Sequence, residues 1–453
     1  MFRRSFLRIG SVAAGAALTC AGEADAQHPG GHASHGKPAP PSGPVPPSTP
    51  VARSEFAAPG QVAVVTPDGV TLPWRLVGGV KVGHLVAEEI EHVFAPGLSA
   101  TAWGYNGRTP GPTIEAVEGD RVRLYVTNRL PEPTSVHWHG VVVPNGMDGV
   151  SGLTQRPIPP GETFVYEFTL RRAGTFMYHS HFDEMVQIAF GMVGMFVVHP
   201  RRPLGPPVDR DFVLMTHEWR LEVGARRPNP IEMTDFNVLT FNSKAFPGTQ
   251  PMLVARGERV RLRLGNLGPM DHHPIHIHGV SFKTTGTDGG FIPPGAQVPE
   301  STVLVPVGST RVIEFVPDEP GDWIVHCHMT HHMMTQMGHN IHSMVGADTK
   351  NLDERMRRVA PAYMTMGTTG MGAMTEMNMP VPPNSLPMRG TPGPFSTIDM
   401  GGMVTILKVR ERPSEADITG YYEHPPGTVA GQADAAQMAA DGVDVGTGNH
   451  HRS

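Results

Sequence analysis

Short runs in which apolar and polar residues alternate recur along the middle of this 453-residue chain. Residues 122–126, 164–168 and 260–264 are examples, with the sequences VRLYV, FVYEF and VRLRL. A period of two is typical of a strand that buries one face. The 53 glycines and 46 prolines supply frequent turns between such runs, as in sandwiches of many short strands. The pattern therefore predicts an all-β fold made of β-sandwiches.

The start of the chain has a different composition. Residues 1–26 contain the pair Arg3-Arg4, an apolar run over 9–18 and a stretch of small residues that ends at Ala26. These features are typical of a twin-arginine signal peptide. The apolar run is far shorter than the ~20 residues that a membrane anchor needs. We therefore expect export by the twin-arginine route to the periplasm or the outside of the cell.

Two further segments have compositions that are typical of disorder. Residues 27–58 combine His28, His32 and His35 with a proline-rich run, and residues 413–453 are rich in small and polar residues. We expect a disordered linker and a disordered tail. Copper capture by the three histidines of the linker stays open as an alternative.

Charge and cysteine content narrow the range of partners. The net charge of −6 and the scattered Lys and Arg residues argue against nucleic acid or an anionic membrane as a partner. Cys20 would be removed with the signal peptide, which leaves Cys327 as the only thiol. No disulfide can then form within a subunit.

The histidines of the alternating region come in closely spaced groups. Each of four groups contains a pair of the form H-x-H, and in a strand both imidazoles of such a pair point to one face. Together the pairs supply eight imidazoles, which suit copper, zinc, iron or nickel. The pairs are His137 and His139, His179 and His181, His276 and His278, and His326 and His328.

A thiolate in the last group narrows the choice of metal to copper. Cys327 is the middle residue of the last pair. With His273, His332 and Met337 it forms the set of two histidines, one cysteine and a weak axial methionine that defines a type 1, or blue, copper site for electron transfer. We therefore predict a type 1 site in the second half of the chain.

The two halves of the chain look like copies of one domain. When their H-x-H pairs are aligned, the first half has other residues where the second half has the type 1 ligands. Only the second half can then hold type 1 copper. The alignment places Thr134, Ser180, Met185 and Phe190 opposite His273, Cys327, His332 and Met337.

The motifs around these residues resemble those of the multicopper oxidases, in particular the two-domain, laccase-like kind. The similarity covers roughly residues 75–345. It implies two cupredoxin-like Greek-key β-sandwich domains, over residues 59–205 and 206–412. Only 91 residues separate His181 from His273, which leaves no room for the middle domain of three-domain laccases. The matching stretches are H-W-H-G at 137–140, H-S-H at 179–181, H-P-I-H-I-H-G at 273–279 and H-C-H-M-T-H-H-M-M-T-Q-M at 326–337.

The resemblance also implies four coppers, of which one is type 1, one is type 2 and two are type 3. In the family, the type 2 and type 3 coppers lie between the first and the last domain. His137 and His276 match the type 2 ligands, and the other six paired histidines match the type 3 ligands. With only two domains, domain 1 of one subunit would face domain 2 of the next. Such head-to-tail contacts close into a ring, so a homotrimer is expected.

In the family, a substrate gives up single electrons at the type 1 site, and dioxygen is reduced by four electrons to water. Cys327 would lie on the electron path, because the backbone joins it to His326 and His328. Asp148 matches the acidic residue that assists proton delivery in relatives. A turn-forming role for this aspartate, which precedes a glycine, stays open.

The segment of about residues 345–400 separates the last histidine motif from an apparent closing strand at 402–409. We interpret it as a methionine-rich insertion in domain 2. Thioethers such as those of Met366, Met371 and Met379 favour Cu(I), which suggests copper handling or cuprous oxidation. The alternative is a flexible lid whose methionines pack on apolar surface.

Three functions follow from this set of motifs. The first is the oxidation of phenols or aromatic amines at the exposed edge of His332. The second is a metal oxidase that acts on Cu(I) or Mn(II), in copper resistance or manganese oxidation, which the methionine-rich segment and the export signal favour. The third is a copper nitrite reductase, which is disfavoured because its mononuclear catalytic centre leaves no use for eight paired histidines.

Overall fold

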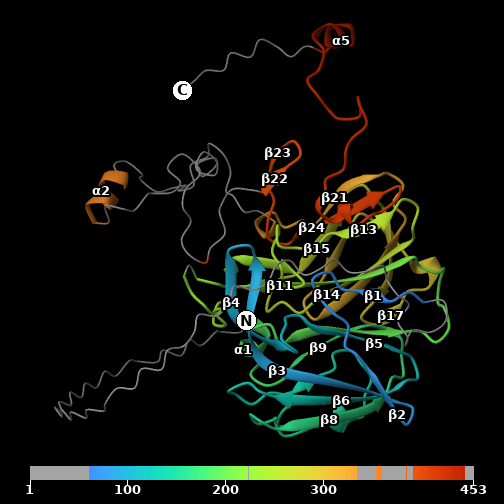
Figure 1. Ribbon diagram of the computed structural model, residues 1–453, viewed down its shortest axis with the longest axis vertical. Coiled ribbons are helices and arrows are strands. Elements are labelled where there is room, and N and C mark those ends of the chain that lie inside the picture. Colours follow the sequence, from blue (N-terminus) through green and yellow to red (C-terminus); the bar gives the residue numbers. More distant parts are fainter. Residues whose placement is uncertain (1–60, 223, 334–351, 360–383, 385–390, 444–453) are drawn as a thin grey trace, which may run out of the picture. The chain divides into compact units, whose positions relative to one another are not determined.

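The computed structural model describes residues 61–222, 224–333, 352–359, 384 and 391–443 (Figure 1). Strands dominate this part of the chain, and the predicted all-β fold of two sandwiches is confirmed. The expected signal peptide and linker, Met337 and most of the methionine-rich insertion lie outside the described residues.

The first sandwich encloses a core that is rich in aromatic residues, including Trp138, Tyr166, Tyr178 and Phe196. Strand β6 buries every second residue, as the alternation in its sequence predicts. One sheet has the order β2-β3-β6-β8, with β4 paired to β3, and the other has the order β5-β10-β9-β7. The strands are β2 (Arg75–Val77), β3 (Val80–Ala95), β4 (Leu98–Tyr105), β5 (Gly111–Val117), β6 (Arg121–Asn128), β7 (Val136–His137), β8 (Thr163–Thr169), β9 (Gly174–Ser180) and β10 (Val193–His199).

The second sandwich is built in the same way, and its core includes Cys327. One sheet has the order β1-β11-β14-β20-β16-β17, with β12 paired to β11 and β18 to β16, and the other has the order β13-β24-β21-β15-β19. The strands are β1 (Val64–Val65), β11 (Arg210–Trp219), β12 (Val238–Phe241), β13 (Met252–Ala255), β14 (Val260–Asn266), β15 (His273–Ile277), β16 (Phe282–Thr287), β17 (Gly290–Phe291), β18 (Pro299–Glu300), β19 (Thr302–Val305), β20 (Ser309–Phe315), β21 (Gly321–Cys327) and β24 (Val404–Arg410).

The two histidine-bearing sheets have matching topology and register. In each of them the last strand pairs in parallel with the first strand and antiparallel with the strand that carries an H-x-H pair. His137 lies opposite His179 on β7 and β9, and His276 lies opposite His326 on β15 and β21. The copper ligands expected from the sequence therefore occupy equivalent places in two copies of one fold.

Buried side chains join the two sandwiches. Met177 and Met195 of the first pack against Val213, Met215 and Leu267 of the second. Strand β1 precedes the first sandwich in sequence but pairs in parallel with β11, so it extends a sheet of the second. The domain limits expected from the sequence, residues 59–205 and 206–412, stay a prediction.

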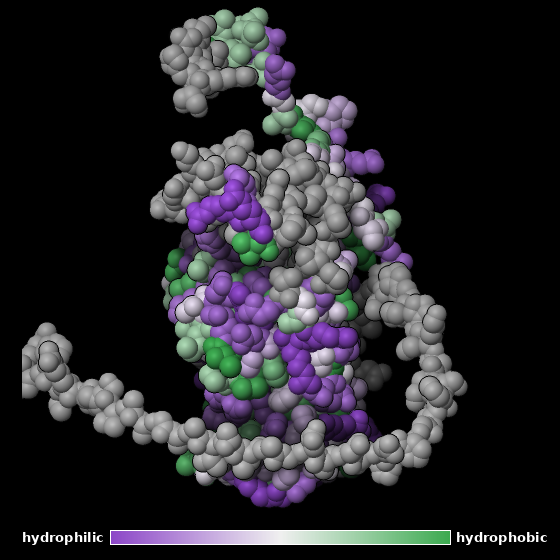
Figure 2. All heavy atoms as spheres, turned by 90° about the vertical axis from the view of Figure 1, so that its left-hand side faces the viewer, coloured by the Kyte–Doolittle hydropathy of each residue, from purple (hydrophilic) through white to green (hydrophobic). Residues whose placement is uncertain are grey.

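Short elements surround the sandwiches, and none of the described helices is long and apolar enough to cross a membrane. Figure 2 shows hydrophilic and hydrophobic residues interspersed over one face of the described part. The short elements are η1 (Asn145–Met147), α1 (Glu184–Ala189), η2 (Pro294–Ala296), η3 (Thr330–His332), α2 (Leu352–Val359), β22 (Thr391–Gly393), β23 (Ser396–Ile398), α4 (Ala416–Thr419) and α5 (Ala435–Ala440).

Candidate metal centres

Three side chains of the second sandwich converge on one buried point. The Sγ of Cys327 lies 3.7 Å from Nδ1 of His273 and 3.6 Å from Nδ1 of His332, and the two Nδ1 atoms are 3.3 Å apart. We call these three residues the Cys–His triangle. Ile275 lies opposite Cys327 in the β15–β21 ladder. His273, two residues before Ile275, is therefore on the same face as the thiol.

The size of the triangle fits a trigonal metal site. Bonds of about 2.0 Å to imidazole and about 2.3 Å to thiolate, set at 120°, separate the ligand atoms by roughly 3.5 to 3.7 Å. The three observed separations lie within about 0.2 Å of this range. Two imidazoles and one thiolate in a plane are the ligands of a blue-copper site.

The start of β24 holds the loop that carries His332. The N–H of Met403 donates to the carbonyl of His332, and the N–H of Cys327 donates to the carbonyl of Met403. Gly402 has a φ of +64°, and a Cβ at this position would lie 2.6 Å from the carbonyl oxygen of His332. Only glycine fits this close backbone approach.

Burial shifts the pKa values of two residues of the triangle. It raises the pKa of the Cys327 thiol to about 12, and it lowers the pKa of His332 to about 4, with a smaller contribution from His273. The imidazole of His332 is therefore neutral and has a free lone pair at neutral pH. The thiol must lose its proton when a metal binds.

The outward edges of the two triangle histidines meet carboxylates. Nε2 of His273 lies 3.2 Å from Oε2 of Glu218, and both side chains are fully buried. Nε2 of His332 lies 3.5 Å from Oδ2 of Asp271, whose side chain is one-third exposed. Sequence reasoning missed both carboxylates. The position of Glu218 three residues after the apolar run 212–215 was the available signal for this carboxylate.

The corresponding place in the first sandwich is filled by neutral polar side chains. The hydroxyls of Thr134 and Ser180 donate to Oε1 of Gln187 over 2.7 and 2.5 Å. The Nε2 of Gln187 donates to the carbonyl of Pro133. Because Thr134 and Ser180 align with His273 and Cys327, the first sandwich has no type 1 ligand set at this position.

The first histidine cluster consists of His137, His139, His179 and His181, whose neighbouring rings lie 5.4 to 6.1 Å apart. Nδ1 of His137 donates to the carbonyl of Asp148, and Nδ1 of His179 donates to the carbonyl of Ser180. The His139 ring has the opposite orientation, since it donates through Nε2 instead of Nδ1. The acceptor is the carbonyl of Gly308 in the second sandwich. Nδ1 of His139 and Nε2 of His179 face each other at 3.3 Å.

The second histidine cluster consists of His276, His278, His326 and His328, with neighbouring rings 5.0 to 5.6 Å apart. Nδ1 of His276 donates to the carbonyl of Ser301, and Nδ1 of His326 donates to the carbonyl of Cys327. These bonds leave Nε2 of both rings available, and Nε2 of His326 lies 3.2 Å from Nε2 of His278.

Several cluster histidines are kept neutral by burial. It lowers the pKa of His179 to about 3, and it lowers the pKa values of His139, His278 and His326. A neutral imidazole has one lone pair for a metal, and the hydrogen bond at its other nitrogen fixes which atom that is. Both clusters are therefore suited to hold copper.

The two clusters are separate within one chain. Among the described residues, every close approach of three ligand atoms falls within the triangle or within one cluster. No ring contact links a histidine of the first cluster to one of the second in this part of the chain. The eight histidines thus form two separate clusters of four.

Asp148 lies beside the first cluster, immediately after η1. Its Oδ1 is 3.5 Å from Nδ1 of His137, and its side chain is about one-third exposed. His272, which precedes a triangle residue, accepts a hydrogen bond from the N–H of Val307 through Nδ1. Met337 and residues 345–351 lie outside the described residues.

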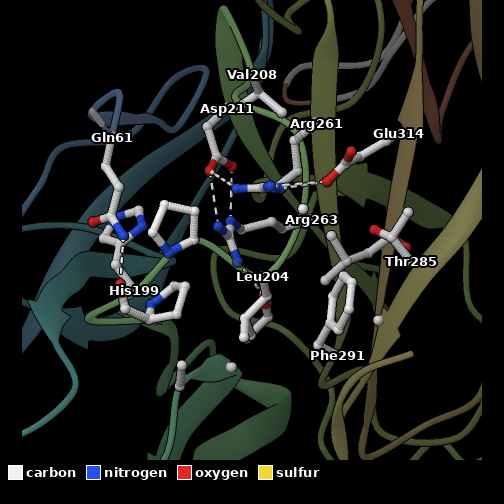
Figure 3. A pocket seen from close by; sticks show the side chains of 18 of the residues that line it. Gln61, His199, Leu204, Val208, Asp211, Arg261, Arg263, Thr285, Phe291 and Glu314 are labelled. Atoms are coloured by element: carbon white, nitrogen blue, oxygen red, sulfur yellow. Dashed lines mark hydrogen bonds and ion pairs between the residues drawn. The ribbon is translucent and has the colours of Figure 1, made fainter. Parts of the chain in front are cut away.

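A cavity of about 310 Å³ lies between the two sandwiches, and none of the triangle or cluster residues lines it (Figure 3). Its lining includes an ion-pair network in which Arg261 contacts Asp211 and Glu314, and Arg263 contacts Asp211. The guanidinium groups are balanced by carboxylates, so this network holds strands β11, β14 and β20 together.

Comparisons with known proteins agree with the geometry of the histidines. Two family models, each described as multicopper oxidase, match residues 87–203 and 222–346. The Copper resistance protein A of Pseudomonas syringae pv. tomato is 30% identical in a 257-residue alignment that covers 46% of this chain and 42% of that protein. Laccase-1 of Cryptococcus neoformans var. neoformans is 31% identical over 229 residues, 49% of this chain and 31% of that one. The chain spans about two fifths or less of the length of these relatives.

Solved structures are similar over more of their length. A blue copper oxidase from Nitrosomonas europaea superposes with a TM-score of 0.54 at 27% identity, over 75% of this chain and 90% of that one. The multicopper oxidase mgLAC gives a TM-score of 0.53 at 27% identity, over 73% and 87% of the two chains.

Proposed function

Because the chain belongs to the multicopper oxidase family, we propose that it couples the one-electron oxidation of a phenol or aromatic amine to the four-electron reduction of dioxygen to water. The observation that carries this proposal is the position of Cys327. Its Sγ is part of the Cys–His triangle, while its two neighbours in sequence, His326 and His328, belong to the second cluster. One residue thus bridges an electron-accepting site and a cluster suited to oxygen chemistry.

In this proposal, the three donor sets would share four coppers. The triangle, together with Met337, would hold type 1 copper. His137 and His276 would hold type 2 copper, and the other six cluster histidines the two type 3 coppers. When bound, the coppers would supply one-electron redox chemistry at the triangle and dioxygen reduction at the clusters.

The residues of the chain have distinct tasks in this scheme. Electrons would leave the triangle through the Cys327 thiolate and its backbone, toward His326 and His328. Nδ1–H of His326 donates to the carbonyl of Cys327 at 2.8 Å. This hydrogen bond would give electrons a second, shorter path from Cys327 to the His326 ring. Asp148, beside His137, would deliver protons to the site where oxygen is reduced.

The separation of the two clusters supports a homotrimer. A site for three coppers needs both clusters, and one chain does not bring them together. A head-to-tail ring would place the first cluster of one subunit against the second cluster of the next. We also keep export by the twin-arginine route as a proposal.

The substrate would meet the protein at the outward edge of His332. Asp271 stands at this edge with one-third of its side chain exposed. Its carboxylate can accept a hydrogen bond from a phenol or amine that gives up an electron to the triangle. A second candidate function is the oxidation of Mn(II) or Cu(I). The same carboxylate offers an oxygen ligand, which suits Mn(II), and the methionines of the 345–400 segment offer thioethers, which suit Cu(I).

Oxygen consumption by the copper-loaded protein tests both functions. A methoxyphenol, Cu(I) and Mn(II) are compared side by side, before and after deletion of residues 345–399. Phenol turnover that survives the deletion, without metal turnover in either form, supports the laccase-like activity. Metal turnover that the deletion abolishes supports the metal oxidase. Absence of oxygen uptake with every substrate would contradict the oxidase proposal.

A further inference from the structure

The carboxylate of Glu218 lies among two backbone N–H groups and one imidazole nitrogen. Oε1 accepts hydrogen bonds from the backbone N–H of Met270 at 2.7 Å and of Asp271 at 2.8 Å. Oε2 lies 3.2 Å from Nε2 of His273. An ionised carboxylate only accepts hydrogen bonds, so two backbone N–H donors on one oxygen and an imidazole nitrogen beside the other match the charged form.

The fold makes room for this carboxylate in the interior. Glu218 is fully buried on β11, and it reaches His273 across 55 positions of sequence. A Cβ on Gly268 would lie 1.8 Å from Oε2 of Glu218, so the loop passes the carboxylate at a place where only glycine fits. Burying an acid is costly unless its oxygens are satisfied, and here the loop 268–273 satisfies them.

The contact fixes the orientation of the His273 ring. A proton on Nε2 that is donated to Glu218 leaves the lone pair on Nδ1, the atom that faces Cys327 and His332. Carboxylates that hold metal-binding histidines in this way also raise the basicity of the imidazole.

The charge of the carboxylate has a second effect. A buried negative charge next to a copper ligand stabilises the oxidised copper more than the reduced one, since the oxidised form has one more positive charge. His332, the other triangle histidine, faces the partly exposed Asp271 instead, where solvent weakens the same effect.

We infer that Glu218 is a positioning residue that sets the tautomer of His273 and lowers the reduction potential of the copper held by the Cys–His triangle. This inference rests on the proposed type 1 site. Glu218, which lies outside the ligand motifs, would then limit the driving force with which the copper oxidises a substrate.

The test is Glu218→Gln, which keeps the shape of the side chain and removes its charge. A redox titration followed by the blue absorption of the copper-loaded protein should give a higher midpoint for the variant. At a fixed potential we expect an oxidised-to-reduced ratio about tenfold lower, which corresponds to 59 mV for one electron. The absorption band itself should remain, because the three ligands are unchanged.

Glu115→Gln is the matched control. Glu115 is also buried and also pairs with a histidine, at 2.7 Å from Nε2 of His199, but neither residue belongs to the triangle. The midpoint potential of the type 1 copper in the Glu115→Gln variant should equal that of the unmodified protein. A Glu218→Gln variant with an intact blue band and an unchanged midpoint would overturn the inference.

The unmodified protein allows a second measurement in case the variant does not fold. Pulsed EPR of the oxidised type 1 copper in D₂O follows exchange of the remote imidazole protons. The Nε2 proton of His273, enclosed with Glu218, should exchange more slowly than that of His332. Equal and rapid exchange of both would contradict the contact with Glu218. If the unmodified protein lacks the blue band altogether, the proposed type 1 site fails, which is a different outcome.

Discussion

The Nε2–H of His139 donates to the carbonyl oxygen of Gly308 over 2.8 Å, and this bond ties a histidine of the first sandwich to a turn of the second. It leaves Nδ1 of His139 to face His179. Gly308 has a φ of +72°, in the left-handed region that favours glycine. The packing of the two sandwiches therefore orients one of the proposed copper ligands.

We predict that Gly308→Ala lowers the copper content of the histidine clusters and leaves the blue absorption of the triangle unchanged. The left-handed backbone costs about 1 to 2 kcal/mol for a residue with a Cβ, and relief of this strain would move the carbonyl away from His139. Copper analysis and the visible spectrum separate the two effects. Gly257→Ala is the control, because Gly257 also has a positive φ, +82°, and no atom within 4 Å of the added Cβ. Equal copper contents in both variants would refute the role of Gly308.

Cys327→Ser should abolish both the blue absorption and oxygen consumption with any substrate. The substitution removes the thiolate on which the colour and the electron path depend, while the cluster histidines stay in place. Spectra and oxygen-electrode assays of the copper-loaded variant check this. Ser180→Ala changes the corresponding position of the first sandwich and should keep both properties. Turnover by the Cys327→Ser variant would rule out the proposed electron path.

The sequence was sufficient to predict the fold class and to single out the described side chains that form the triangle and the two histidine clusters. The spacing of H-x-H pairs determines which side chains share a face of a strand, and this is a local property of the chain. The alignment of Ser180 with Cys327 also corresponds to the observed register, in which Val136 and Ile275 lie opposite these residues. Such features depend on neighbours along one strand or across one ladder.

Contacts between distant elements could not be predicted in the same way. Glu218 lies 55 positions before His273, and Gly308 lies 169 positions after His139. Strand β1 consists of only two valines, and nothing in this short sequence indicates that it pairs with β11 of the second sandwich. Asp271 is close to His273 in sequence, yet its contact is with His332, and it depends on how the η3 loop folds back.

Stability should fall as the pH drops below about 6.5, in part because of His92. Burial lowers the pKa of this histidine to about 3, with Lys244 contributing, and its Nε2 bonds to the carbonyl of Ser243. The unfolded chain therefore binds a proton between about pH 6.5 and 3 that the folded chain does not, and the folded state loses a few kcal/mol across this window.

Thermal unfolding of His92→Gln across this range tests the assignment. The glutamine does not titrate, so the Tm of the variant should depend less steeply on pH between 6.5 and 3 than that of the unmodified protein. At pH 8 the variant should be less stable, because the edge-on contact between His92 and Phe94 is lost. If the Tm of both proteins fell equally with pH, groups other than His92 would cause the acid sensitivity.

Asp148→Asn should slow oxygen reduction by about 10²-fold, the lower end of the usual contribution of a positioned acid or base. The carbonyl of Asp148, which accepts the bond from His137, is retained in the variant. Reduction of the type 1 copper under anaerobic conditions should therefore proceed at an unchanged rate. Stopped-flow measurements of type 1 copper reduction by substrate and of reoxidation by dioxygen separate proton delivery from ligand positioning. A defect in anaerobic reduction would instead indicate a structural role for this residue.

The separation of the two clusters predicts that the type 1 site and the shared site respond differently to dissociation of the subunits. The triangle lies within one chain, so a monomer should keep its blue copper. The type 2 and type 3 coppers would need the first cluster of one subunit and the second of another, so they should be lost. Light scattering should give three times the chain mass for the active protein.

Mixing two inactive variants tests the sharing of the clusters directly. One variant carries His137→Ala and His139→Ala in the first cluster, and the other carries His276→Ala and His278→Ala in the second. In randomly mixed head-to-tail rings, about one quarter of the interfaces would combine two intact clusters, so oxygen consumption should return to about one quarter of the normal level. If each chain completed its own copper site, no mixture would recover activity, because every chain would contain one damaged cluster.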